Sequence, residues 1–170
     1  MNTRASPYLT RGFTLIELLV VIAIIGILSA VVLASLNTAR GKANDAQRLT
    51  NIRSVQQALE LYASDNDGKY PTTANTWYSH CTAFGGYAVD SAIPGLVPKY
   101  IGSLPSDSQQ NDTAVACCYM YLSNATDYKY IFYNCAASKA CYSSTINPGY
   151  SDPGRPTNAC GVYTPGAALW

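Results

Sequence analysis

The sequence predicts an α+β fold, with a long N-terminal helix packed on a small antiparallel β-sheet head and a loop-rich, disulfide-tied C-terminal region. Three observations support this prediction. Residues 13–36 form a membrane-length apolar run, and residues 46–62 continue with apolar side chains every three or four positions. Residues 115–122 and 128–133 are β-rich runs separated by a polar turn. All six cysteines lie after residue 80, so cross-links are expected only in the sheet-forming part.

Length and charge limit the classes of protein that fit this chain. The 170 residues are enough for one modest domain and a long terminal element. Charged residues make up 12%, about half of the usual share, and the net charge is +1. From residue 69 onward there are five basic and five acidic residues, so this part creates no field that would attract nucleic acid.

Residues 13–36 are the first element, and Glu17 is their only charged residue. As a helix, this segment would span roughly 36 Å at about 1.5 Å per residue, which is enough to cross a bilayer. Arg4 and Arg11 precede it without any acidic residue, so the positive-inside rule keeps residues 1–12 in the cytoplasm.

Three interpretations of this segment compete. A secretory signal peptide could be cut near residues 32–34, but its apolar core would exceed the usual length of about 7–15 residues. A plain transmembrane anchor fits the length but leaves Glu17 unexplained, because a carboxylate in lipid is costly. If the chain is instead cut after Gly12, Phe13 becomes a positively charged N-terminus. Glu17 then lies about one helical turn further on, where it can pair with that amine on its own or a neighbouring chain.

The residues around this junction also carry a family resemblance. The heptapeptide 11–17 (RGFTLIE), with the aliphatic run that follows it, resembles the class III signal of type IV pilins and type II secretion pseudopilins. The resemblance implies that a prepilin peptidase cuts after Gly12 and N-methylates Phe13. It also implies that Glu17 pairs with the Phe13 amine of an adjacent subunit during assembly.

One residue departs from the family pattern. Many pilins carry a helix-breaking proline eight residues after the glycine matched here by Gly26, and this chain has Ala34 instead. The expectation of a kink or a melted stretch is therefore weaker, although Gly26 and Ser29 still lower the local helix propensity.

These observations predict four consecutive parts of the chain. They are a removed cytoplasmic leader (1–12), a transmembrane and filament-core helix from Phe13 to Leu36, an amphipathic stalk helix (37–66) and a globular β head with a cysteine-rich C-terminal region (67–170).

The stalk helix is expected to hold the sheet of the head through one apolar stripe. The stripe consists of Ala46, Leu49, Ile52, Val55, Leu59 and Tyr62. Gly68 suits a helix C-cap, and Pro71 follows as a stop signal. The tetrapeptide 65–68 (DNDG) could also suggest a calcium loop, but the later ligands and the closing Glu of such a loop are absent.

The two β-rich runs predict a hairpin whose side chains alternate between two faces. Tyr119 and Tyr121 share one face in the first run, and the second run alternates Tyr128, Tyr130 and Phe132 with Lys129, Ile131 and Tyr133. One of these faces is expected to pack on the helix stripe. Residues 143–170 contain four prolines and are expected to form loop rather than strand.

The cysteines predict a disulfide framework formed in an oxidising compartment. They are Cys81, Cys117, Cys118, Cys135, Cys141 and Cys160. Free thiols and a metal site are the alternatives, and a metal is disfavoured because there is no C-x-x-C pair and His80 is the only histidine. Fifteen connectivities are conceivable for six cysteines.

Some limits on the pairing follow from the spacing of the cysteines. Cys117 and Cys118 should point to opposite faces of a strand and so have separate, distant partners. Cys135 and Cys141 are close enough to close one small loop, and Cys160 is expected to tie the C-terminal segment to the sheet.

The resemblance implies a structural subunit, without enzymatic activity, that polymerises through its N-terminal helix into a type IV pilus-like or type II secretion pseudopilus filament. The implied partners are copies of itself, other pilins or pseudopilins, a prepilin peptidase, an inner-membrane platform protein and an assembly ATPase. The chain is expected in the inner membrane with its head outside the cytoplasm, and then in a periplasmic or extracellular filament.

No cofactor is expected. Calcium is disfavoured because residues 107–112 (DSQQND) stand where the pseudopilin major subunit has its calcium-binding loop. Residues 93–105, by contrast, resemble the pseudopilin segment that leads into the sheet, whereas the cysteine-rich region is more typical of pilins.

The alternative function is a minor pilin that acts as a binding module, for adhesion or DNA uptake, at the filament tip. Most of the 14 tyrosines lie from Tyr62 onward, and exposed aromatic rings can stack on bases or sugars. DNA binding also needs a basic groove, which the balanced charge does not supply, so nucleic acid is not the expected partner. An enzyme is disfavoured because a His80–Cys81 dyad would require two sequence neighbours to point at each other.

Overall fold

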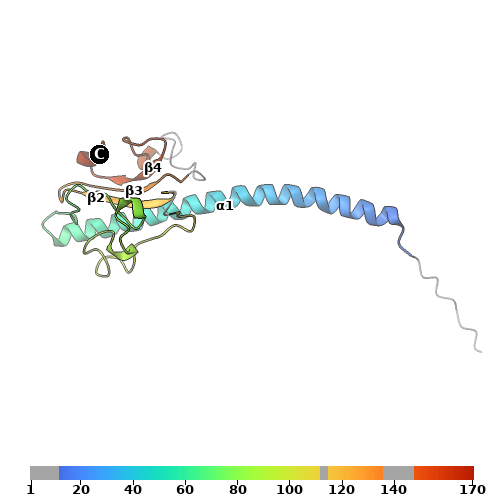
Figure 1. Cartoon of the computed structure of the whole chain (residues 1–170), viewed down its shortest axis with the longest axis horizontal. Helices are drawn as coiled ribbons and strands as arrows, with labels where there is room; N and C mark the ends of the chain where they lie inside the picture. The colour runs from blue at the N-terminus through green and yellow to red at the C-terminus, as the bar shows by residue number, and fades with distance from the viewer. Residues whose placement is uncertain (1–11, 112–114, 136–147) are drawn as a thin grey trace, which may run out of the picture. The chain divides into compact units, whose positions relative to one another are not determined.

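The computed structural model describes residues 12–111, 115–135 and 148–170. The chain divides into two compact units, Met1–Arg40 and Gly41–Trp170. Helix α1 (Leu15–Asp65) contributes to both units (Figure 1).

In the first unit, α1 is a helix of exposed aliphatic side chains. It is long and apolar enough to cross a membrane. The helix continues through Gly26 and Ser29 without a break, because both residues retain helical backbone. The structure therefore shows regular helix at Gly26 and Ser29, where the sequence alone did not decide whether the helix melts.

In the second unit, α1 ends in a cap formed by Asp67 and Gly68. The Gly68 N–H donates to the Ala63 carbonyl at 2.8 Å, and the backbone of Asp67 is left-handed, with φ of 53°. This is the pattern of a Schellman cap, in which the first residue past the helix adopts the left-handed conformation. Our prediction of Gly68 as the cap was therefore one residue late: Asp67 takes the left-handed position, and Gly68, with φ of 75°, follows it.

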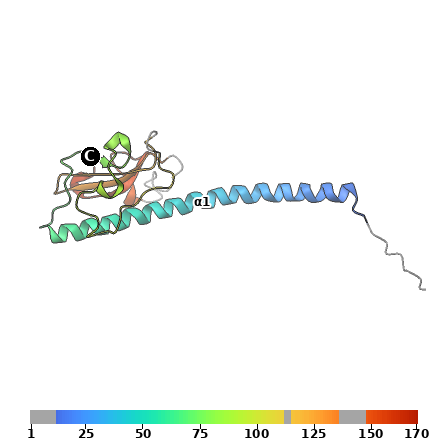
Figure 2. The ribbon, with the colours of Figure 1, turned by 60° about the horizontal axis from the view of Figure 1, so that its bottom comes forward.

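Within the described residues, the sheet of the second unit has four antiparallel strands in the order β1-β2-β3-β4. The strands are β1 (Tyr78–Ser79), β2 (Cys118–Ser123), β3 (Tyr128–Tyr133) and β4 (Ala159–Tyr163). Figures 1 and 2 show β2, β3 and β4 on one side of the C-terminal part of α1. The predicted hairpin is thus confirmed as β2 and β3.

Two sequence-based boundaries were wrong for identifiable reasons. Strand β2 starts at Cys118, whereas the predicted β-rich run starts at Val115, because Val115 and Cys117 have φ of 52° and 54°, which a strand does not accommodate. The C-terminal segment, predicted as loop, contains β4. This strand fits between Pro156 and Pro165, so that no proline interrupts its pairing with β3.

The alternation of side chains along the hairpin is confirmed. Tyr119, Tyr121, Tyr128, Tyr130 and Phe132 are buried in one cluster with Ile52, Val55 and Leu59 of α1. Met120 and Ile131 point to the opposite face, where they pack with Cys81, Cys118 and Ala159. The apolar stripe of the helix is confirmed at its centre, but Ala46 at its start is exposed, and the buried position nearby belongs to Arg48.

The buried tyrosines predict that the second unit loses stability in alkali. Burial raises the pKa of Tyr119 to about 12, and it also raises the pKa of Tyr121, Tyr128 and Tyr130. A tyrosine in the unfolded chain ionises near pH 10, so these groups stabilise the fold fully below about pH 10. For Tyr119, this stabilisation is lost as the pH rises toward about 12.

Urea unfolding followed by circular dichroism at a series of pH values checks this expectation. The free energy of unfolding should fall steadily above about pH 10, and Tyr119→Phe should make that fall shallower. A free energy that stays constant up to pH 11.5 would show that these hydroxyls are not desolvated.

Candidate functional site

The start of α1 carries the residues for which the sequence predicts processing and assembly. Gly12 and Phe13 precede the helix and are exposed, with 85% of Phe13 accessible. A Cβ added to Gly12 would meet no atom within 4 Å, so nothing in the described part of the chain crowds this peptide bond. Residues 1–11 lie outside the described ranges.

Thr14 and Glu17 form a capping box that the sequence-based reasoning missed. The Thr14 N–H and the Thr14 hydroxyl both donate to Glu17 Oε2 at 2.8 Å, and the Glu17 N–H donates to Thr14 Oγ1 at 3.2 Å. Because α1 begins at Leu15, Thr14 is the N-cap and Glu17 is the third helical residue. The signal was present in the sequence as T-x-x-E directly before an apolar run.

The capping box gives Glu17 a local role that does not depend on a second chain. Only one of its two carboxylate oxygens takes part, since both bonds from Thr14 end on Oε2. Among the described residues, none donates a hydrogen bond to Oε1. A carboxylate can accept at both oxygens, so Glu17 can close the helix start and still receive a donor from outside.

The remaining described side chains between Phe13 and Leu36 present an apolar surface. The exposed large residues of this range include Leu15, Ile16, Leu18, Leu19, Ile22, Ile25, Leu28, Val31 and Leu33. Such a continuous exposed apolar surface marks a segment that contacts lipid or other protein.

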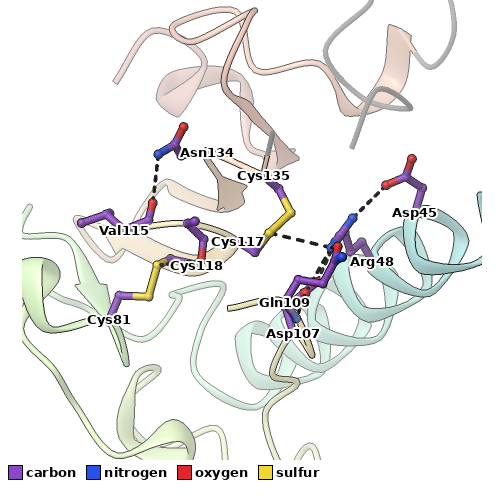
Figure 3. The surroundings of a disulfide bond; sticks show 11 residues. Asp45, Arg48, Cys81, Asp107, Gln109, Val115, Cys117, Cys118, Asn134 and Cys135 are labelled. Carbon is purple, nitrogen blue, oxygen red and sulfur yellow. Dashed lines mark hydrogen bonds and ion pairs between the residues drawn. A yellow bond between two sulfur atoms is a disulfide. The ribbon is translucent and has the colours of Figure 1, made fainter. Parts of the chain in front are cut away.

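A second cluster lies in the second unit, where Arg48 joins α1 to the loop before β2 (Figure 3). Arg48 is 1% exposed. Its Nε donates to Asp107 Oδ2 at 2.6 Å, and its two terminal nitrogens reach Asp45 at 2.9 Å and Gln109 at 2.7 Å. The guanidinium also lies 5.7 Å from the ring centroid of Phe132.

The charges around Arg48 compensate for its burial. Burial alone would lower the pKa of Arg48, but hydrogen bonds and charge from Asp107 and Asp45 raise that pKa above its usual value. Asp107 is the first of residues 107–112, which stand where the pseudopilin major subunit has its calcium-binding loop, and both of its carboxylate oxygens accept hydrogen bonds from Arg48. In this structure Asp107 therefore fastens the head to the stalk part of α1.

Two disulfides stabilise the same region (Figure 3). Cys81 is bonded to Cys118 and Cys117 to Cys135, so that the adjacent cysteines have separate partners, as predicted. The suggested small loop between Cys135 and Cys141 is wrong, because the backbone turn at Cys117 brings Cys135 to it. Cys160 is also disulfide-bonded, and Cys141 lies outside the described residues.

These disulfides also bear on two chemical alternatives, a catalytic His80–Cys81 dyad and a metal site with cysteine ligands. Cys81 is not a thiol, so it cannot serve as the nucleophile of a His80–Cys81 dyad. Asp107 lies close to the sulfurs of Cys117 and Cys135, but both sulfurs are in a disulfide and cannot bind a metal as thiolates.

The chain has an exposed apolar N-terminal segment, whose helix start is closed by the Thr14–Glu17 capping box, and a disulfide-bonded α+β unit. These features define a pilin-like chain. Residues 9–33 match the prokaryotic N-terminal methylation motif.

Three similar proteins extend the match. The chain is 41% identical over 68 residues to type II secretion system core protein G of Pectobacterium carotovorum, covering 40% of this chain and 43% of that protein. It is 33% identical over 125 residues to core protein G of Vibrio cholerae, covering 66% of this chain and 70% of that protein. It is 47% identical over 57 residues to the type IV wide pilus major component PilA4 of Thermus thermophilus, covering 34% of this chain and 44% of that protein.

The chain belongs to the family of type IV pilins and type II secretion pseudopilins. It spans less than half of the Pectobacterium and Thermus relatives and more than two thirds of the Vibrio relative. No solved structure matches the chain. The family is one of structural pilin and pseudopilin subunits.

Proposed function

We propose that this chain is a filament subunit that is cut after Gly12, N-methylated at Phe13 and held in the inner membrane by residues 13–36. Its head lies outside the cytoplasm. The subunit then polymerises through its N-terminal helix into a pilus or a secretion pseudopilus. One observation carries the proposal: Glu17 is the only charged residue of the exposed apolar segment 13–36, and its Oε1 receives no donor from the described residues.

Two charges at the edge of the lipid favour assembly. Cutting after Gly12 creates an amine on Phe13 at the edge of the apolar segment, and an unpaired amine and carboxylate there are both costly. Pairing the Phe13 amine of one subunit with Glu17 of its neighbour removes both costs at once and fixes the register of the two helices. Glu17 Oε2 keeps its capping role in this arrangement, while Oε1 accepts the neighbour's amine.

The proposed partners follow from this route. A prepilin peptidase would cut and methylate the chain, and an inner-membrane platform protein with an assembly ATPase would drive polymerisation with copies of this chain or other pilins. The function requires no cofactor. The alternative role as a tip-binding module loses part of its support, because Tyr119, Tyr121, Tyr128 and Tyr130 are buried and cannot stack on a ligand.

Fractionation of cells that express the chain tests the proposal. Filaments sheared from the surface, or from the periplasm for a pseudopilus, should contain the chain, and membranes should contain the unassembled pool. An abundant amount in filaments indicates a major subunit, and a trace amount indicates a minor one. Recovery of the chain only as a soluble species, absent from filaments and membranes, would contradict the proposal.

A further inference from the structure

A buried lysine lies where the C-terminal segment meets the sheet. Lys129 of β3 and Asp152 both have 0% side-chain exposure. The three protons of the Lys129 ammonium have three oxygen acceptors: Asp152 Oδ1 at 2.8 Å, the Ala168 carbonyl at 2.9 Å and the Trp170 main-chain oxygen at 3.1 Å. Every donor of this ammonium is therefore satisfied by the protein.

A second cation, Arg155, contacts two of these three acceptor residues, Asp152 and Trp170. Arg155 Nη1 donates to the Trp170 main-chain oxygen at 2.7 Å and lies 3.3 Å from Asp152 Oδ2. The Gly154 N–H also donates to Asp152 Oδ1, at 3.0 Å. The Arg155 guanidinium lies 5.0 Å from the ring centroid of Trp77. Trp77 and Trp170, the two tryptophans of the chain, thus both border this cluster.

Burial of the Lys129 ammonium has a cost in free energy. Burial lowers the pKa of Lys129, and the hydrogen bond and charge of Asp152 only oppose that shift. Apolar side chains in place of both Lys129 and Asp152 would avoid this cost. What the ammonium provides is a common donor for oxygens that are 23, 39 and 41 residues away along the chain.

The acceptors are also of the kind that hold a hard metal ion. One carboxylate oxygen and two main-chain oxygens are the usual ligand types for such ions. Here the Lys129 ammonium is the central cation, and it is covalently part of β3. The ring of Tyr163, the register partner of Lys129 on β4, lies 5.4 Å from Nζ and covers the site further.

We propose that Lys129 is a built-in cation that closes the C-terminal segment 151–170 onto the sheet, so that this closure needs no bound metal ion. The proposal does not depend on filament assembly. It concerns the fold of the second unit, and it predicts which residue must be kept for the C-terminal segment to dock.

Replacing the charge while keeping the bulk tests the proposal in the full-length chain in detergent. Lys129→Met should lower Tm by about 10 °C, because it leaves the two main-chain oxygens without this donor. The tryptophan emission should move to longer wavelength as Trp170 becomes solvated, while far-UV circular dichroism retains the helix. Lys99→Met is the matched control, since Lys99 pairs with Asp65 at the same 2.8 Å but in solvent, and it should change neither property.

Chemical rescue tests the role as a cation directly. Lys129→Ala should leave an oxygen-lined space that a small alkylammonium ion can fill. Ethylammonium chloride should therefore raise the Tm of Lys129→Ala more than sodium chloride or tetramethylammonium chloride at the same concentration. It should have no such effect on the wild-type chain or on Lys129→Met, in which the space is filled.

Two measurements on the wild-type chain keep the proposal testable if both variants fail to fold. Acylation of lysines under native conditions should modify Lys99 readily and Lys129 only after unfolding. Addition of EDTA should leave the tryptophan emission unchanged. Acylation of Lys129 as fast as Lys99, a shift of the emission in EDTA, or a Lys129→Met variant with wild-type Tm and emission would each overturn the proposal.

Discussion

Glu17→Gln is expected to reduce the yield of filaments below about one per cent of the wild-type yield, while the chain remains folded and in the membrane. Gln can still accept the Thr14 N–H as the third residue of a capping box, so the helix start should keep its cap. It carries no charge, however, and it leaves the Phe13 amine of the neighbouring subunit without a counter-charge in lipid. The variant therefore separates the capping role of Glu17 from its proposed assembly role.

Quantification of the chain in sheared filaments and in membranes measures this effect. Glu60→Gln is the matched control, because Glu60 is the other glutamate of the chain, lies on the same helix and is exposed in the second unit. It should assemble normally. Normal filaments from Glu17→Gln would show that the capping box alone explains this residue, and the proposed pairing with the Phe13 amine would then be wrong.

Arg48→Met is expected to lower the free energy of unfolding of the second unit by about 3–5 kcal/mol. The substitution keeps an apolar stem of similar length but leaves the carboxylates of Asp107 and Asp45 without their cation. Removing one member of a buried charge cluster is costly because the remaining charges have lost their compensation. Urea unfolding followed by circular dichroism measures the loss.

Two further variants make this result interpretable. Arg53→Met, on the exposed side of α1 where Arg53 donates to the Tyr150 hydroxyl, should cost less than about 1 kcal/mol. The double variant Arg48→Met, Asp107→Leu should recover part of the stability, because an apolar pair can replace a buried ion pair. A loss below about 1 kcal/mol for Arg48→Met alone would mean that the cluster does not fasten the loop before β2 to α1.

The parts of the fold that follow a repeating pattern of apolar residues could be predicted from the sequence. The apolar spacing of residues 49–62 indicated the face of α1 that packs on the sheet, and the alternation in residues 119–132 indicated the two faces of the hairpin. Both patterns are local, and the side chains involved are apolar or aromatic, so their burial follows from their type. The structure confirms the predicted α+β class.

The errors concern residues whose surroundings are made by distant parts of the chain. Arg48 is a charged residue on a helix, for which solvent exposure is the ordinary expectation, and only Asp107 explains its burial. The bond between Cys117 and Cys135 depends on a backbone turn that no spacing rule indicates. Strand β4 forms because β3 offers an edge to a short proline-free stretch, which is a tertiary effect.

The residues of the candidate assembly site, by contrast, are close together in the sequence. Gly12, Phe13 and Glu17 were selected from the sequence, and the structure added that Thr14 closes a capping box with one oxygen of Glu17. That motif is local and could have been found from T-x-x-E alone. Glu17 is isolated from other charges in the sequence, but its hydrogen-bond partner Thr14 is only three residues away.

The mass of the N-terminal peptide from the chain isolated in filaments tests the central claim most directly. The proposed processing predicts a peptide that begins at Phe13, carries one additional methyl group on its amine and lacks residues 1–12. A chain that still begins before Phe13 would show that assembly does not use the proposed terminus. A chain that begins near residue 35 would show that the apolar segment is removed as a signal peptide, and either result would contradict the account.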